Sequence, residues 1–186
     1  MGRMWRIAVE RAGLSDVAER ALVGRGLVDA DLARLRAADT LVLAGMADAV
    51  RERHRGDEVR MLSEATARRE RCVVLDAGTF GAPGAQGATG EELLRAIALA
   101  RLGAPGVQTI AVRFDLLGLE LAQVALAFGA DAWCGDFGAR GVLPLFDVSE
   151  RRAEIHGLLE RIGRRAVWTD ARAPGAESGA SAEEHA

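Results

Sequence analysis

The fold class of this chain is decided by residues 107–134, which read VQTIAVRFDLLGLELAQVALAFGADAWC. Val107–Arg113 is a mostly apolar run with β-branched side chains and predicts a strand. Leu117–Phe128 has the length and apolar pattern of a helix, and Asp131–Cys134 predicts a second, short strand. A strand, a helix and a strand in close succession are typical of a right-handed βαβ unit with parallel strands.

The same alternation continues on both sides of this stretch and predicts an α/β fold with a parallel sheet. Cys72–Asp76 is a continuous apolar run that ends in an acidic residue, as expected where both faces of a parallel strand are covered. The other predicted elements are the strands Glu58–Leu62 and Arg165–Trp168, the loop Gly78–Gly90, a helix opened by the capping box Thr89–Glu92 and running through Leu102, and the helix Ser149–Ile162.

Helices predominate in the first third of the chain. One is predicted from Ser15 to Val23, a second is capped by Asp29 or Asp31, and a third runs from Asp39 until Gly56 ends it. The sequence therefore predicts a helical lead-in over residues 1–57, parallel βα units over residues 58–170 and a disordered tail over residues 171–186, which has nothing to bury.

Composition excludes several classes of function. The 186 residues fit one domain, and the net charge of −3 comes from 24 basic residues scattered among 27 acidic ones, which argues against nucleic acid or anionic lipid as partners. Every basic residue is arginine, and the chain has no Lys, Asn or Tyr, so it has no Schiff-base lysine and no tyrosine general acid. No apolar run has the length of a signal peptide or a membrane span, so we expect a cytoplasmic, non-membrane protein.

The few cysteines and histidines give no sign of a metal site or a disulfide framework. Cys72 and Cys134 are far apart in the sequence and outside any Cys-x-x-Cys pair, and the three histidines have no ligand spacing. Cys134 lies on a short apolar strand, and we interpret it as a small, buried hydrophobic residue and not as a nucleophile. The sequence therefore predicts neither a metal nor another cofactor.

Four charged residues lie at or just beyond the carboxyl ends of predicted strands, where parallel α/β folds place their ligand-contacting loops. They are Asp76, Arg113, Asp115 and Asp136. We interpret them as candidates for binding a small molecule. The alternative is that they are solvated strand ends or one local Arg–Asp pair, and position alone does not decide between the two readings.

Two blocks, Ala21–Val59 and Leu93–Asp170, resemble a known family. They are similar to the N-terminal helices and the last βα units of a group of radical S-adenosylmethionine (SAM) enzymes. The group comprises aminofutalosine synthase and dehypoxanthinyl futalosine cyclase, which act in the futalosine route to menaquinone, and their relative in deazaflavin cofactor synthesis. The resemblance implies a partial TIM-type barrel preceded by helices, and it adds Gln123, in a retained part of the pattern, as a candidate ligand contact. An ordinary amide on a helix surface remains the alternative for Gln123.

The part of the family pattern that binds the iron–sulfur cluster is missing. In the family, three cysteines follow the first strand and hold a [4Fe–4S] cluster, but here Ser63–Glu70 follows it without a cysteine. A complete barrel of this type needs about 250 residues. The resemblance thus implies a cluster-less, non-catalytic paralogue that acts as a binding or partner subunit, without a cofactor and with no catalytic residue assigned.

Incomplete barrels leave open sheet edges, so we expect a homo-oligomer or a partner chain that covers them. The alternative is an enzyme that acts on a futalosine-like nucleoside and uses Asp76, Asp115 or Asp136 as acid or base.

Overall fold

The computed structural model of the chain describes residues 4–75, 89–103, 109–135, 137 and 148–169. The expected disordered tail, the loop Gly78–Gly90 except its last two residues, and the candidates Asp76 and Asp136 lie outside the described residues.

Four helices form the lead-in: α1 (Met4–Arg11), α2 (Ser15–Leu22), α3 (Asp29–Ala37) and α4 (Thr40–Arg55). The Asp39 carboxylate caps α4 by accepting a hydrogen bond from the Leu41 amide, and Gly56, with φ of 62°, ends it, as predicted. Helix α1 was not predicted from the sequence. It packs on α4 where Gly45 has no side chain, since a Cβ atom there would lie 2.8 Å from Cβ of Trp5.

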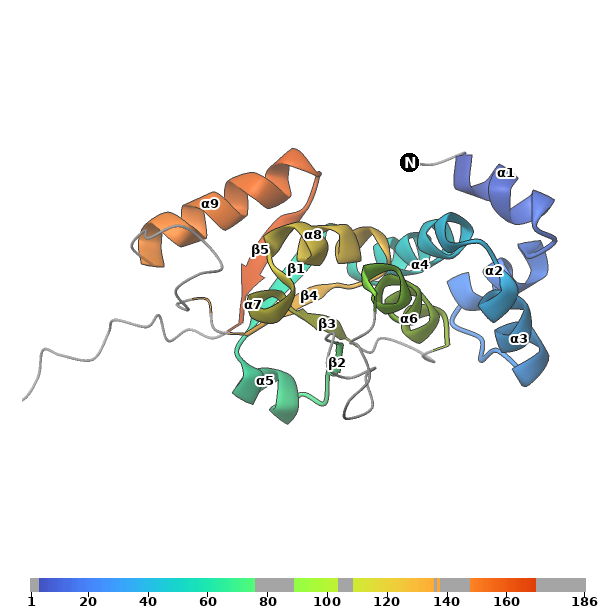
Figure 1. Cartoon of the computed structure of the whole chain (residues 1–186), viewed down its shortest axis with the longest axis horizontal. Coiled ribbons are helices and arrows are strands. Elements are labelled where there is room, and N and C mark those ends of the chain that lie inside the picture. Colours follow the sequence, from blue (N-terminus) through green and yellow to red (C-terminus); the bar gives the residue numbers. More distant parts are fainter. Residues whose placement is uncertain (1–3, 76–88, 104–108, 136, 138–147, 170–186) are drawn as a thin grey trace, which may run out of the picture.

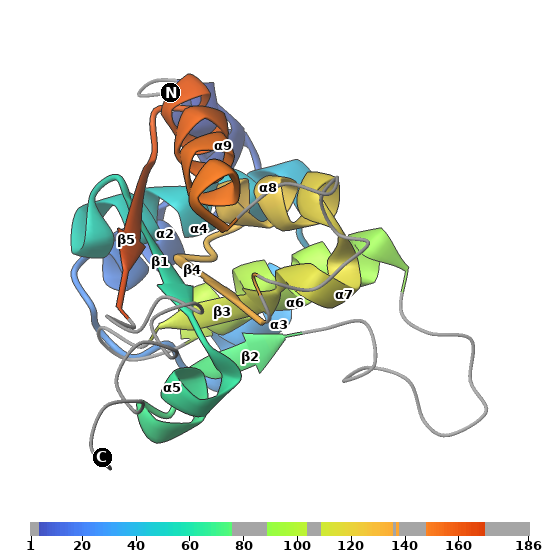
Figure 2. The same cartoon turned by 90° about the vertical axis from the view of Figure 1, so that its left-hand side faces the viewer.

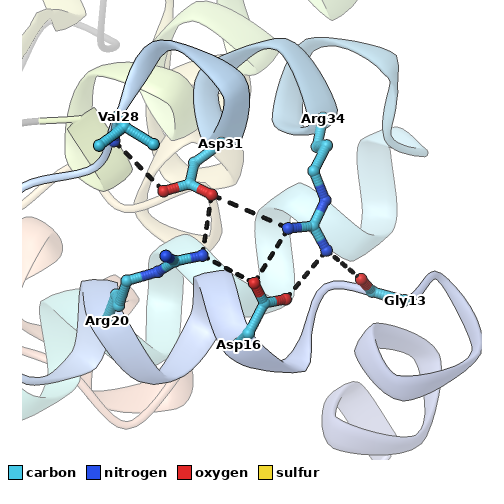
Figure 3. Close-up of polar contacts among 6 residues, drawn as sticks. All are labelled: Gly13, Asp16, Arg20, Val28, Asp31 and Arg34. Carbon is cyan, nitrogen blue, oxygen red and sulfur yellow. Dashed lines mark hydrogen bonds and ion pairs between the residues drawn. The ribbon is translucent and has the colours of Figure 1, made fainter.

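An ion network fixes α2 to α3 (Figure 3). Asp16 of α2 accepts hydrogen bonds from Arg34 of α3, at 2.9 and 3.0 Å, and from Arg20, at 2.7 Å. Arg20 also donates to the buried carboxylate of Asp31, which in turn accepts from the Val28 amide at the start of α3. The hydrogen bond with Arg34 lowers the pKa of Asp16 to about 2.

Five parallel strands form one sheet in the order β2-β3-β4-β1-β5 (Figure 1). The strands are β1 (Glu58–Leu62), β2 (Val73–Leu75), β3 (Ile110–Arg113), β4 (Ala132–Cys134) and β5 (Arg165–Trp168). The predicted α/β class and parallel sheet are confirmed. Among the described strands, β2 and β5 are the edges.

The remaining helices are α5 (Glu64–Arg69), α6 (Gly90–Gly103), α7 (Phe114–Leu117), α8 (Leu119–Ala127) and α9 (Val148–Arg161). The prediction of one helix over Leu117–Phe128 was wrong in its start, because Gly118, with φ of 76°, separates α7 from α8. The short helix α5 was also not predicted. Its N-cap is Ser63, whose hydroxyl accepts a hydrogen bond from the Thr66 amide.

The long helices α4, α6, α8 and α9 cover one face of the sheet, and α5 lies on the other (Figures 1 and 2). Alternate strand residues, such as Met61, Val112 and Trp133, belong to the main core beneath the long helices. The residues between them form a second, smaller buried cluster with Ala67 of α5: Leu62, Ala111, Ala132 and Cys134. Both faces of the central strands are therefore buried, as their apolar sequences predicted.

Candidate functional site

Two charged clusters occupy opposite ends of the sheet. The cluster at the carboxyl ends is centred on Arg113, the last residue of β3, and is the predicted candidate site. The cluster at the amino ends is centred on Asp131, which directly precedes β4. Parallel α/β folds bind their ligands at the carboxyl ends of the strands, whereas polar groups at the amino ends more often serve stability.

Arg113 and Asp115 form a two-pronged ion pair at the carboxyl end of β3. The guanidinium donates from Nε to Oδ1 of Asp115 at 2.8 Å and from Nη2 to Oδ2 at 2.7 Å. Its remaining nitrogen, Nη1, lies 2.8 Å from a carboxylate oxygen of Glu64, the first residue of α5. Hydrogen bonding to Asp115, aided by the charge of Glu64, raises the pKa of Arg113 above its ordinary value.

Asp115 also lies close to the backbone that follows the neighbouring strand, β4. Gly135, just after β4, has φ of 144°, and a Cβ atom placed on it would lie 2.3 Å from Oδ1 of Asp115. The Gly135 amide donates to the Leu62 carbonyl of β1 at 3.2 Å, which fixes this backbone in place. The carboxylate therefore occupies space that any other residue at position 135 would fill.

An aromatic row lies beside this ion cluster and crosses the ends of three strands. Phe114 stacks on Trp133 and on Phe137, with ring centroids 6.0 and 4.5 Å apart. Phe137 contacts the ring of Trp168, the last residue of β5, edge-on at 5.1 Å. Trp133 is fully buried and donates its indole N–H to the Ala122 carbonyl of α8. These contacts pack the carboxyl ends of β3, β4 and β5 into one apolar layer.

The sequence-based candidates are thus brought together only in part. Arg113 and Asp115 meet as the local Arg–Asp pair that was the alternative reading. Gln123 is half-buried in the middle of α8, in the helical layer, and has no assigned part in the Arg113 cluster. Glu64 belongs to that cluster and was not predicted, although its place two residues after β1 was a signal for it.

The cysteines have the properties of structural thiols. Cys134 is 1 % exposed, and burial raises its pKa to about 11, which leaves almost no reactive thiolate at neutral pH. Burial also raises the pKa of the half-buried Cys72. Among the residues that the structure describes, no group of three or more His, Cys, Asp or Glu side chains is arranged to hold a metal ion.

The cluster at the amino ends of the strands is the more deeply buried one. The carboxylate of Asp131 is fully buried, and its Oδ1 accepts from Nη2 of Arg101 and from the Ile110 amide, both at 2.7 Å. Its Oδ2 lies 2.8 Å from Nε of Arg55 at the end of α4. Arg101, 1 % exposed at its side chain, also donates to the Gly129 carbonyl. Desolvation lowers the pKa of Arg101, and the charge of Asp131 opposes that shift.

Asp131 therefore joins two helices to the sheet. It connects α4 and α6, which supply its two arginines, to the amide that starts β3. Each side chain of this cluster named above binds another group of the chain, so we interpret the cluster as one that stabilises the fold.

Comparisons with known proteins give no relative for this chain. No protein-family model matches the sequence, and neither the curated proteins nor the solved structures contain a significant match. Within the described residues, none of the helices is long and apolar enough to cross a membrane.

Proposed function

We propose that this chain is a non-catalytic binding or partner subunit built on part of a TIM-type barrel, a cluster-less paralogue of the radical SAM enzymes of menaquinone biosynthesis. The observation that carries the proposal is the ion cluster of Arg113, Asp115 and Glu64. The guanidinium uses all three of its nitrogens on these two carboxylates. Charged groups at the carboxyl ends of β1 and β3 thus bind each other, which suits a scaffold better than a reaction site.

The strand order supports a barrel origin only in part. Strands β2, β3 and β4 are neighbours in chain order, and β4 then pairs with β1, the first strand. In a closed barrel the last strand lies between the strand before it and the first strand, whereas here the last strand, β5, pairs with the far side of β1. The doubly wound orders 3-2-1-4-5-6 and 2-1-3-4-5 do not contain the succession β2-β3-β4-β1. The helices α4, α6, α8 and α9 on one face of the sheet agree with the outer ring of a barrel, whereas α5 packs on the face that a barrel turns inward (Figure 2).

The edge strand β5 supports a role in binding a partner chain. The amide of Arg165 donates to the carbonyl of Asp57, just before β1, and the amide of Thr169 donates to the carbonyl of Met61 in β1. In a parallel strand the intervening residues, Ala166 and Trp168, turn their backbone groups to the opposite side. No other described strand pairs with that side of β5. An edge of this kind is a template for another strand, from a second copy or from a different protein.

The enzyme alternative has less support. It assigns acid or base chemistry to Asp76, Asp115 or Asp136, and Asp115 is engaged by Arg113 through both carboxylate oxygens. A carboxylate in that position is a poor acid or base, because taking up a proton would break a two-pronged ion pair. The other two aspartates lie outside the described residues.

Light scattering of the purified full chain, over a range of concentrations, tests the partner role. We expect a dimer or a larger assembly, and a monomer at every concentration would contradict self-association and leave only a different protein as partner. Ala166→Pro tests the edge, since its N–H faces away from β1 and its loss removes no described hydrogen bond of the sheet. We expect this variant to keep its circular dichroism spectrum and to run as a monomer.

Val167→Pro is the matched control, because it removes an amide on the side of β5 that pairs with β1 and should destabilise the fold itself. For the enzyme alternative, Asp115→Asn is the variant to combine with assays of nucleoside turnover. Turnover by the wild type that is lost in Asp115→Asn would overturn the proposal of a non-catalytic subunit.

A further inference from the structure

Helix α9 holds Trp168 at the end of the edge strand by two side chains. The guanidinium carbon of Arg152 lies 4.4 Å from the centroid of the Trp168 ring, at the distance of a cation–π contact. One helical turn further on, Nε2 of His156 accepts a hydrogen bond from the Trp168 indole N–H at 3.2 Å. Phe137 also contacts this ring edge-on, with the ring centroids 5.1 Å apart.

The hydrogen bond fixes the protonation state of His156. The indole nitrogen only donates, so Nε2 of His156 must carry its lone pair, and the imidazole proton must be on Nδ1. A protonated imidazole donates from both nitrogens and has no acceptor to offer. Uptake of one proton by His156 therefore abolishes this hydrogen bond and turns two N–H groups toward each other.

The charged groups around His156 do not replace the hydrogen bond that the Trp168 indole loses. On α9 they are Arg152, already over the same ring, and Glu160, exposed one turn further on. On β5 the charged residue is Arg165, at the other end of the strand and paired with Glu58. The neighbouring helix α8 has one ionisable residue, the exposed Glu120 in its first turn. A second cation beside Arg152 leaves two positive groups competing for one ring.

We infer that His156 is a proton-operated latch on the edge strand. The neutral imidazole holds Trp168 against α9, and protonation releases the indole and loosens the carboxyl end of β5. The helix itself stays in place, because Ile155 and Leu159 are fully buried in the main core. The change is therefore local to Trp168 and the backbone that follows it. This latch does not depend on the proposed partner role.

Nuclear magnetic resonance of the ¹⁵N-labelled full chain tests the latch. The chain has three indole N–H groups, of Trp5, Trp133 and Trp168, and the spectrum of Trp168→Phe assigns the last. As the pH is lowered from about 8 to about 5, we expect the Trp168 indole signal to shift together with the imidazole signals of His156. Trp133 is the internal control, since its indole donates to a backbone carbonyl and should not respond.

Exchange of the Trp168 indole proton with solvent gives the size of the effect. Corrected for the intrinsic pH dependence of exchange, it should become roughly 2- to 12-fold faster after protonation, the factor that corresponds to the loss of one ordinary hydrogen bond. His156→Gln keeps an acceptor and removes the titration, so the Trp168 signal should stay near its neutral-pH position throughout. His54→Gln, on α4, is the matched control and should leave the response intact.

Two results would overturn the inference. One is a Trp168 indole signal that does not move while His156 titrates. The other is an unchanged pH response of Trp168 in His156→Gln, which would assign the response to another group.

Discussion

Replacing Asp131 by Asn tests which charged cluster holds the fold together. Asn keeps the shape and one acceptor for the Ile110 amide, but it removes the negative charge that faces Arg101. The Arg101 side chain is 1 % exposed and cannot turn to water, so it becomes a buried cation that has lost the charge of Asp131 beside it. Breaking a buried ion pair in this way costs about 3–5 kcal/mol. That is a large part of the roughly 5–15 kcal/mol that stabilises a typical domain.

Urea unfolding followed by circular dichroism is the assay. With a slope of about 2 kcal/mol per molar, the midpoint of Asp131→Asn should fall by about 2 M. Asp57→Ala is the control for an exposed charge, since Asp57 is 60 % exposed and 4.0 Å from Arg165, and such pairs contribute about 0–1 kcal/mol. Replacing Arg101 by Met together with Asp131→Asn removes both charges and should recover part of the loss.

The reasoning is refuted if Asp131→Asn stays within about 1 kcal/mol of the wild type, a loss typical of exposed positions. It also fails if the double variant loses as much as the two single variants added together, because the two charges would then be independent.

Two further predictions concern the other clusters. Gly135→Ala should destabilise the chain by about 1–3 kcal/mol in urea unfolding, because its methyl group would displace the Asp115 carboxylate and the backbone has a positive φ. The control is Gly157→Ala, in α9 with open space around it, which should be neutral or stabilising. Equal effects of the two changes on stability would contradict the contact between Gly135 and Asp115. The pKa of Asp16 is lowered to about 2, so the network between α2 and α3 contributes stability above pH 4 that is lost as the pH falls toward 2. A carbon-detected titration should show the lowered pKa of Asp16, and Arg34→Gln should return it toward 3.8. An unchanged pKa of Asp16 in Arg34→Gln would refute the pairing of Asp16 with Arg34.

The sequence predicted what depends on neighbouring residues. The cap at Asp39, the end of α4 at Gly56 and the five strands follow from local patterns of apolar residues, caps and glycines, and the structure confirms them. The break at Gly118 was missed because a glycine within an apolar helical pattern does not reveal its own φ.

The sequence did not predict contacts between distant segments. Asp131 was read as an ordinary strand residue, because its partners Arg55 and Arg101 come from helices far from it in the chain. Glu64 joins Arg113 only because α5 packs beside the end of β3. The pair of Arg113 and Asp115 was foreseen as one of two readings, since the residues are two apart. What binds to the carboxyl ends of the strands stays a proposal.

The position of β1 has a consequence for synthesis of the protein. This strand is complete at Leu62, but its two neighbours are β4, complete at Cys134, and β5, complete at Trp168. At about 5–20 residues per second, a ribosome needs several seconds to supply the first of them. During that interval the apolar residues of β1 have no strand to pair with, so the nascent chain depends on its helical lead-in, or on a chaperone, to shield them.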